Sequence, residues 1–90
     1  MISESHISSL IVHTLPDKTV DIGLTLKAMD NVDVFNQIAS IGKIIAVIEA
    51  NSMKATSKLI DRLSQLEGVI NVAMVYHHVE PIHSLDEEFA

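Results

Sequence analysis

The 90-residue sequence contains no cysteine and no tryptophan, and only one of its residues is arginine. Without cysteine, neither a disulfide framework nor a thiolate metal centre can form. The six basic side chains are scattered and the aromatic residues number only three, so we expect no nucleic-acid partner. A net charge of −6 instead favours a basic partner, if charge guides binding at all.

Long apolar runs are also missing. The longest strongly apolar run, Ile44 to Ile48, is far shorter than the roughly 20 residues that span a bilayer. The opening MISESHISS has a glutamate and neither lysine nor arginine, so it lacks the basic start of an export signal. We therefore expect no membrane insertion and a cytoplasmic location.

The length and composition that remain are those of one small folded domain. Ninety residues support a single modest core, and a hydrophobic content of 48% excludes a disordered chain. We expect residues 1–80 to form this domain. Residues 81–90 are acidic and are expected to form a flexible tail.

Apolar periodicity predicts six elements, in the order strand, helix, strand, strand, helix, strand. Residues 6–14, 32–38, 43–50 and 69–78 alternate or are rich in β-branched side chains, which is typical of strands. The two segments between them repeat apolar side chains at helical spacing. The predicted helix stripes are Thr19, Ile22, Leu26 and Met29, widened by Val20 and Leu24, and then Thr56, Leu59, Ile60, Leu63 and Leu66.

This order of elements is that of the ferredoxin-like, or split βαβ, fold of the α+β class. Right-handed crossovers place both helices on one face of a four-stranded antiparallel sheet. The expected order of the strands across the sheet is 4-1-3-2. The opposite face of the sheet then stays open.

The cost of burying an unpaired carboxylate predicts which side chains lie on that open face. Glu49 should lie there, and alternation along the strand places Ile45 and Val47 beside it. Alternation along the last strand likewise places Tyr76 on the side of the sheet that faces the helices. An exposed apolar band of this kind indicates a partner site, with dimerisation through the sheet as the alternative. The predicted binding residues are Ser9, Ile11, Phe35, Ile45, Val47, Glu49, Ala73, Val75 and His77.

The residues offer little for catalysis or metal binding. His77 and His78 are adjacent on a strand, so their side chains point to opposite faces and cannot hold one ion as a pair. The loop after the first strand has no glycine or arginine to cradle a phosphate, and Arg62 is on the second helix, which disfavours a small acyl-phosphate hydrolase. We predict no catalytic residue, no metal and no cofactor.

Three blocks of the sequence resemble the NapD family, the maturation chaperones of periplasmic nitrate reductase. The blocks are SSLIV at residues 8–12, GKIIAVIEA at residues 42–50 and LEGVINVAMVYHHVE at residues 66–80. The last block is the most specific, because its valine-tyrosine-histidine ending is unusual. The resemblance covers residues 6–80.

The resemblance implies a ferredoxin-like protein of the cytoplasm that is neither an enzyme nor a cofactor carrier. It implies binding of the twin-arginine (Tat) signal peptide of the nitrate reductase catalytic subunit, NapA, which holds the precursor back until its molybdenum cofactor is inserted. The alternative is a dimeric regulatory module of the same fold that senses a small ligand. Such a module would usually have glycines in a loop near the first helix, whereas Gly23 lies inside that helix.

Overall fold

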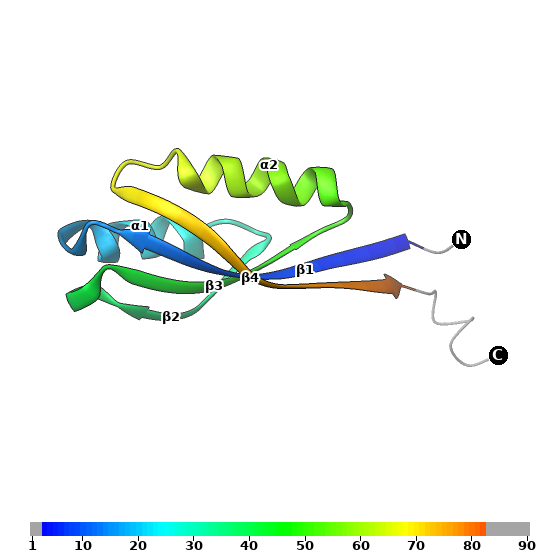
Figure 1. Cartoon of the computed structure of the whole chain (residues 1–90), viewed down its shortest axis with the longest axis horizontal. Helices are drawn as coiled ribbons and strands as arrows, with labels where there is room; N and C mark the ends of the chain where they lie inside the picture. Colours follow the sequence, from blue (N-terminus) through cyan, green and yellow to red (C-terminus); the bar gives the residue numbers. More distant parts are fainter. Residues whose placement is uncertain (1–2, 83–90) are drawn as a thin grey trace.

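The computed structural model describes residues 3–82, which form four strands and two α-helices in the predicted order (Figure 1). The first strand begins at Ser3 rather than His6, and the last ends at Ile82 rather than His78. Residues 83–90, most of the predicted acidic tail, lie outside the described residues. The elements are β1 (Ser3–Thr14), η1 (Pro16–Lys18), α1 (Thr19–Lys27), β2 (Val32–Ile38), η2 (Ala39–Ile41), β3 (Lys43–Ala50), α2 (Met53–Ser64) and β4 (Val69–Ile82).

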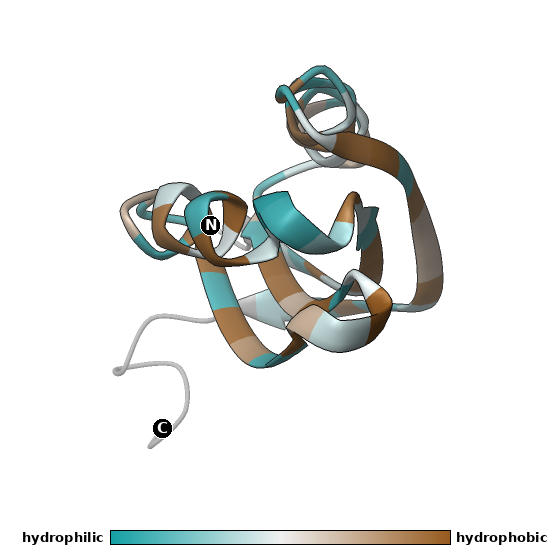
Figure 2. Cartoon of the chain, turned by 90° about the vertical axis from the view of Figure 1, so that its left-hand side faces the viewer, coloured by the Kyte–Doolittle hydropathy of each residue, from teal (hydrophilic) through white to brown (hydrophobic). Residues whose placement is uncertain are grey.

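The sheet confirms the predicted topology. Its strand order is β2-β3-β1-β4, and every neighbouring pair is antiparallel. Seen along the long axis of the molecule, α1 and α2 lie on the same side of the curved sheet (Figure 2). One core joins both helices to the strands, and its fully enclosed members include Leu26 of α1, Leu63 of α2, Leu10 of β1 and Ile44 of β3.

Helix α1 packs on the sheet through a narrow apolar stripe. In α1, Thr19, Ile22 and Leu26 are buried as predicted. Val20 and Leu24 were expected to widen this stripe, and that prediction is wrong, because both are more than half exposed. The helix spans only nine residues and packs mainly over β2, so a single row of side chains fills its contact with the sheet.

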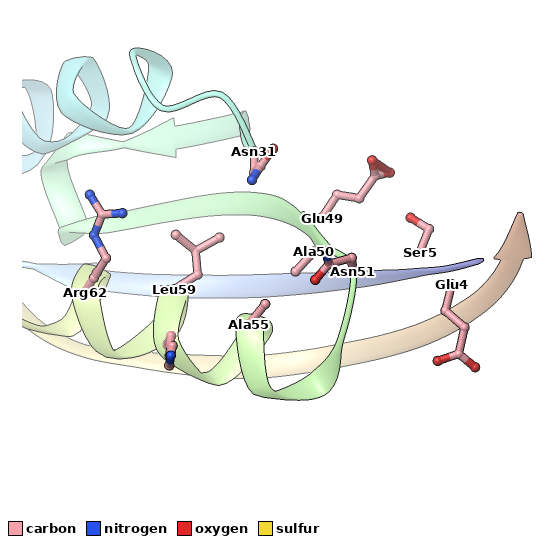
Figure 3. Close-up of a pocket in the computed structure, with 10 residues that line it drawn as sticks. Glu4, Ser5, Asn31, Glu49, Ala50, Asn51, Ala55, Leu59 and Arg62 are labelled. Atoms are coloured by element: carbon pink, nitrogen blue, oxygen red, sulfur yellow. The ribbon is translucent and has the colours of Figure 1, made fainter. Parts of the chain in front are cut away.

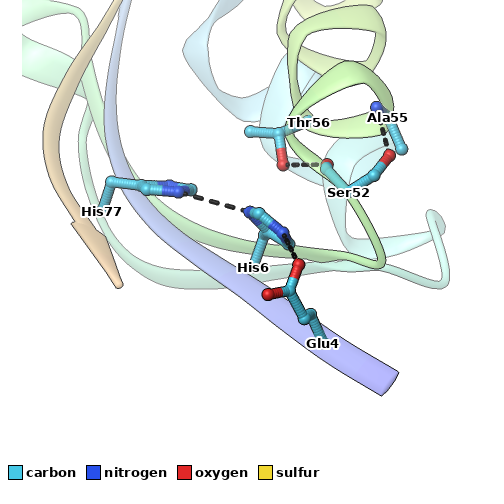
Figure 4. Close-up of polar contacts among 6 residues, drawn as sticks. All are labelled: Glu4, His6, Ser52, Ala55, Thr56 and His77. Atoms are coloured by element: carbon cyan, nitrogen blue, oxygen red, sulfur yellow. Dashed lines mark hydrogen bonds and ion pairs between the residues drawn. The ribbon is translucent and has the colours of Figure 1, made fainter. Parts of the chain in front are cut away.

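The N-terminus of α2 is capped by Ser52. The Ser52 hydroxyl accepts a hydrogen bond from the backbone N–H of Ala55 at 3.0 Å (Figure 4). Thr56, one turn into the helix, donates its hydroxyl to the Ser52 carbonyl at 2.9 Å. The bond from Ala55 satisfies a backbone N–H that a helix N-terminus otherwise leaves without a partner.

Two glycines in the left-handed region hold the end of β1. Gly42 has φ of 62° and Gly68 has φ of 95°. The Gly42 carbonyl accepts from the Thr14 N–H at 2.8 Å, and the Gly68 carbonyl accepts from the Leu15 N–H at 2.8 Å. A Cβ at residue 42 would collide with the Thr14 carbonyl oxygen, so both the dihedral angle and the space favour glycine there.

Both edge strands contain an irregularity in register. On β4, Met74 pairs with Leu10 and Tyr76 pairs with Ser9, which leaves Val75 as an extra residue. On β2, a shift between Val34 and Asn36 leaves Phe35 as the extra residue. A bulge of this kind makes two consecutive residues face one residue of the partner strand, so the alternation of faces restarts beyond it.

Candidate functional site

The centre of the open face is an apolar strip on the two middle strands. Ile11 pairs with Ile45, and Ser9 pairs with Val47. These four side chains are partly buried, whereas the residues that alternate with them in β3 are completely buried in the core. The predicted faces of β1 and β3 are therefore confirmed, and no other element of the described chain covers the strip.

The edge strands widen this strip. Ala73 of β4 pairs with Ile11, and Asp33 of β2 pairs with Val47. The bulge residues of the two edges are both highly exposed, at 80% for Phe35 and 57% for Val75. The structure thus brings eight of the nine predicted binding residues together around one face. We call this set the open-face surface: Ser9, Ile11, Phe35, Ile45, Val47, Glu49, Ala73 and Val75.

The predicted placement of the ninth residue, His77, on the open face is wrong, and so is the placement of Tyr76 among the helices. Because of the bulge at Val75, His77 pairs with the buried Ser8 and lies on the helix side of the sheet. Tyr76 pairs with Ser9, is 58% exposed and lies on the open face. Its ring stacks on His78 at a centroid distance of 6.3 Å.

The hydropathy of this part of β4 favoured the wrong alternation. Uninterrupted alternation from Ala73 places the polar His77 outside and the more apolar Tyr76 inside, which is the arrangement that hydropathy would select. The bulge adds one residue, Val75, to β4, and valine is common in regular strands, so the residue type does not mark the bulge. Neither composition nor periodicity therefore signalled the reversal.

An acidic rim borders the open-face surface where β3 ends and β2 begins. A cavity of about 260 Å³ lies there, with Ile7 and Val47 among its apolar lining. Glu49, Asp30 and Asp33 line the same cavity, and no basic side chain does. Glu49 was predicted from the sequence to lie beside the apolar residues of the open face. Ile7 was not predicted there, although its alternation with Ser9 and Ile11 indicates that face.

A second cavity, of about 570 Å³, lies between α2 and the end of β3 (Figure 3). Its charged lining is mixed, with Lys58 and Arg62 from α2 and Glu4 and Glu49 from the strands. Since both signs of charge are present, the lining does not select one class of charged ligand.

A metal centre finds no support in residues 3–82. These residues contain no group of three or more histidine, aspartate or glutamate side chains arranged to hold a metal. Within the same range, the helices are too short to cross a membrane. The open-face surface with its acidic rim is thus the feature of the described chain that best fits a binding role.

Comparisons with known proteins identify relatives of this chain. The family model described as "NapD protein" matches residues 5–81. The protein "Chaperone NapD" of Escherichia coli K12 is 31% identical over 74 residues, which cover 82% of this chain and 85% of the relative. The "Chaperone NapD" of Haemophilus influenzae is 29% identical over 72 residues, covering 80% of this chain and 77% of the relative.

A solved structure of a NapD protein has the same fold as this chain. The solution structure of the E. coli Tat proofreading chaperone protein NapD superimposes with a TM-score of 0.76 at 30% sequence identity. The match covers 82% of this chain and 78% of that protein. The chain therefore belongs to the NapD family, whose members from E. coli and H. influenzae are chaperones rather than enzymes.

Proposed function

We propose that the protein is a cytoplasmic chaperone that binds the Tat signal peptide of the periplasmic nitrate reductase catalytic subunit, NapA. By holding this peptide, it keeps the precursor from export until the molybdenum cofactor has been inserted. Membership of the family supports the chaperone role, and the solved relative is named a Tat proofreading chaperone. In this role the partner is a peptide, not a nucleic acid or a membrane, and no cofactor is required of the chaperone.

The observation that carries the proposal is the uncovered apolar strip beside an acidic rim. A twin-arginine signal peptide has a basic start followed by an apolar stretch. The strip of Ile11, Ile45 and Val47 offers apolar area for the second part, and Glu49 with its acidic neighbours offers carboxylates for the first. The negative charge of the whole protein favours the encounter with a basic peptide.

The face of the sheet is a better docking place than either edge. The added-strand mode requires an edge with regular spacing of backbone hydrogen-bonding groups. Both edge strands are bulged, at Phe35 and at Val75, and bulges are one of the devices that prevent such pairing. We therefore propose that the peptide lies across the open-face surface, with its apolar side chains on the strip, as an amphipathic helix would. Tyr76 takes the place of His77 among the contacts.

Calorimetric titration with the signal peptide of the cognate NapA tests this proposal. Wild-type peptide should bind, and peptides with Lys-Lys or Gln-Gln in place of the arginine pair should bind more weakly. Arg-carboxylate pairs are bidentate, which lysine cannot reproduce and glutamine cannot match in charge. Absence of binding by all three peptides would refute the proposal.

The alternative, a dimeric module that senses a small ligand, finds some support in the 570 Å³ cavity beside α2. The lining of that cavity includes Leu59 and Arg62 of α2, and no residue of α1. Gly23, the glycine nearest the loop that such modules use, lies inside α1 against the Gln37 side chain. A dimer in light scattering, together with no affinity for the signal peptide, would favour this alternative.

A further inference from the structure

The Ser5 hydroxyl, near the start of β1, is a buried polar group without a partner. Ser5 is 5% exposed, and within residues 3–82 its Oγ makes no hydrogen bond. Such a hydroxyl is costly, because it has lost its contacts with water and gained no others. Ser5 lines the cavity of about 570 Å³ together with Glu49 (Figure 3). A ligand in that cavity therefore gains a hydrogen bond that the protein alone leaves unmade.

Carboxylates flank Ser5 on both sides of β1. Ser5 alternates with Ile7 and Ser9, so it lies on the open face of the sheet. Glu80 of β4 pairs directly with Ser5. Glu49 of β3 pairs with Ile7, the next residue of β1 on the same face. Side chains that are paired across antiparallel strands are close neighbours, so the hydroxyl lies between two negative charges.

The basic side chains of the same cavity belong to the other side of the sheet. Lys58 and Arg62 extend from α2, which covers the helix side (Figure 2). The cavity therefore has an acidic end on the open face, formed by Ser5 and Glu49. The group that suits this end is a cation with several N–H donors. A guanidinium has five such donors and no acceptor, so it can bind a carboxylate and a hydroxyl together.

Glu80 is accessible for such a contact. Its side chain is 59% exposed. Glu80 Oε2 lies 3.5 Å from His78 Nε2, on the same face of the sheet. The two oxygens of a carboxylate together accept several hydrogen bonds, so an arginine can bind Glu80 while the contact with His78 is kept.

We propose that the two arginines of the signal peptide bind on opposite sides of Glu49. One occupies the acidic cavity of about 260 Å³ with Asp30 and Asp33. The other lies over Ser5, between Glu49 and Glu80, and donates a hydrogen bond to the Ser5 hydroxyl. Glu49 lines both cavities, which places it between the two arginines. The inference rests on the proposed function and assigns Ser5 and Glu80 to the recognition of one particular arginine.

Calorimetry of the full chain tests the inference with NapA signal peptides that carry Arg-Arg, Gln-Arg or Arg-Gln at the pair. Ser5→Ala should weaken binding of the Arg-Arg peptide about two- to tenfold, as expected for one hydrogen bond. Glu80→Gln should weaken it about two- to fivefold at low salt. Both effects should vanish with the same single-arginine peptide, the one that lacks the arginine at Ser5. The effect of Asp33→Asn should vanish with the other single-arginine peptide.

Glu67→Gln is the matched control, because it removes one exposed carboxylate before the start of β4, whereas Glu80 lies near the end of that strand. It should leave each affinity within about twofold of wild type. Circular dichroism checks that the variants are folded, and the exposed Glu80→Gln decides if Ser5→Ala unfolds.

The outcomes separate this inference from the proposed function. If the wild-type protein binds the Arg-Arg peptide but Glu80→Gln and folded Ser5→Ala bind it equally well, the inference is overturned and the proposed function stands. The same holds if the effects of Ser5→Ala, Glu80→Gln and Asp33→Asn all vanish with the same single-arginine peptide. If the wild-type protein does not bind the Arg-Arg peptide, both are refuted.

Discussion

Substitution of Val47 by aspartate is the most direct perturbation of the proposed peptide site. Val47 lies in the middle of the open face, between Ser9 of β1 and Asp33 of β2. Its neighbours along β3, Ala46 and Ile48, point into the core and are completely buried. A charge at residue 47 therefore changes the exposed side of the sheet and leaves the core packing in place.

The expected loss of affinity follows from two contributions. Full burial of a valine side chain contributes about 1.5–3 kcal/mol, and Val47 is already partly buried, so the peptide would gain roughly 0.5–1 kcal/mol from covering it. Placing a polar group against an apolar peptide segment costs about 1–3 kcal/mol in addition. The sum, about 1.5–4 kcal/mol, corresponds to a Kd that is roughly 10 to 1,000 times higher.

Calorimetry with the NapA signal peptide measures this change, and Val20→Asp is the matched control. Val20 is 54% exposed on α1, so the control introduces the same charge away from the open face. It should leave the Kd within about twofold of wild type, since distant charges are screened by salt. Unchanged binding by Val47→Asp would show that the peptide lies elsewhere. Unfolding of Val47→Asp, seen by circular dichroism, would contradict the assignment of the two faces.

Three further predictions address the acidic rim and the fold. Glu49→Gln should weaken binding of the wild-type peptide about two- to fivefold at low salt. The same substitution should not change binding of the Gln-Gln peptide, because that peptide has no arginine pair for the Glu49 carboxylate to contact. Gly42→Ala should lower the free energy of unfolding by about 1–3 kcal/mol in urea titrations, because it strains a φ of 62° and crowds the Thr14 carbonyl; a Tm equal to that of wild type would contradict this. Leu63→Ala should cost about 2–5 kcal/mol in the same assay, whereas Leu24→Ala, on an exposed position, should change the stability by less than about 0.5 kcal/mol.

The order and type of the elements were predictable because each has a strong local signal. β3 is a β-branched run between Gly42 and Asn51, and its bounds agree with the structure at both ends. The stripe of α2 was equally clear, whereas either Asn51 or Ser52 could have capped the helix, and the structure shows that Ser52 does. Once the six elements are known, the handedness of crossovers leaves few topologies, and the observed strand order is the one that this rule selects.

The faces of β4 were predictable only as far as the bulge at Val75. Alternation assigned Ile45, Val47 and Glu49 correctly, because one face of β3 has a charge that the core would not accept. Beyond Val75 the same alternation failed, since one extra residue exchanges the two sides of the strand. The error moved His77 from the predicted peptide surface to the opposite side of the sheet.

Local patterns were thus enough to predict a ferredoxin-like fold with an open apolar face, because periodicity and the cost of burying Glu49 act within single elements. The contact between the imidazole rings of His6 and His77 depends instead on how the strands pair. The pairing of β1 with β4 brings His6 against His77, although 71 residues separate them in the chain. Strand register is a property of two segments together, so no pattern within either strand could have predicted that contact.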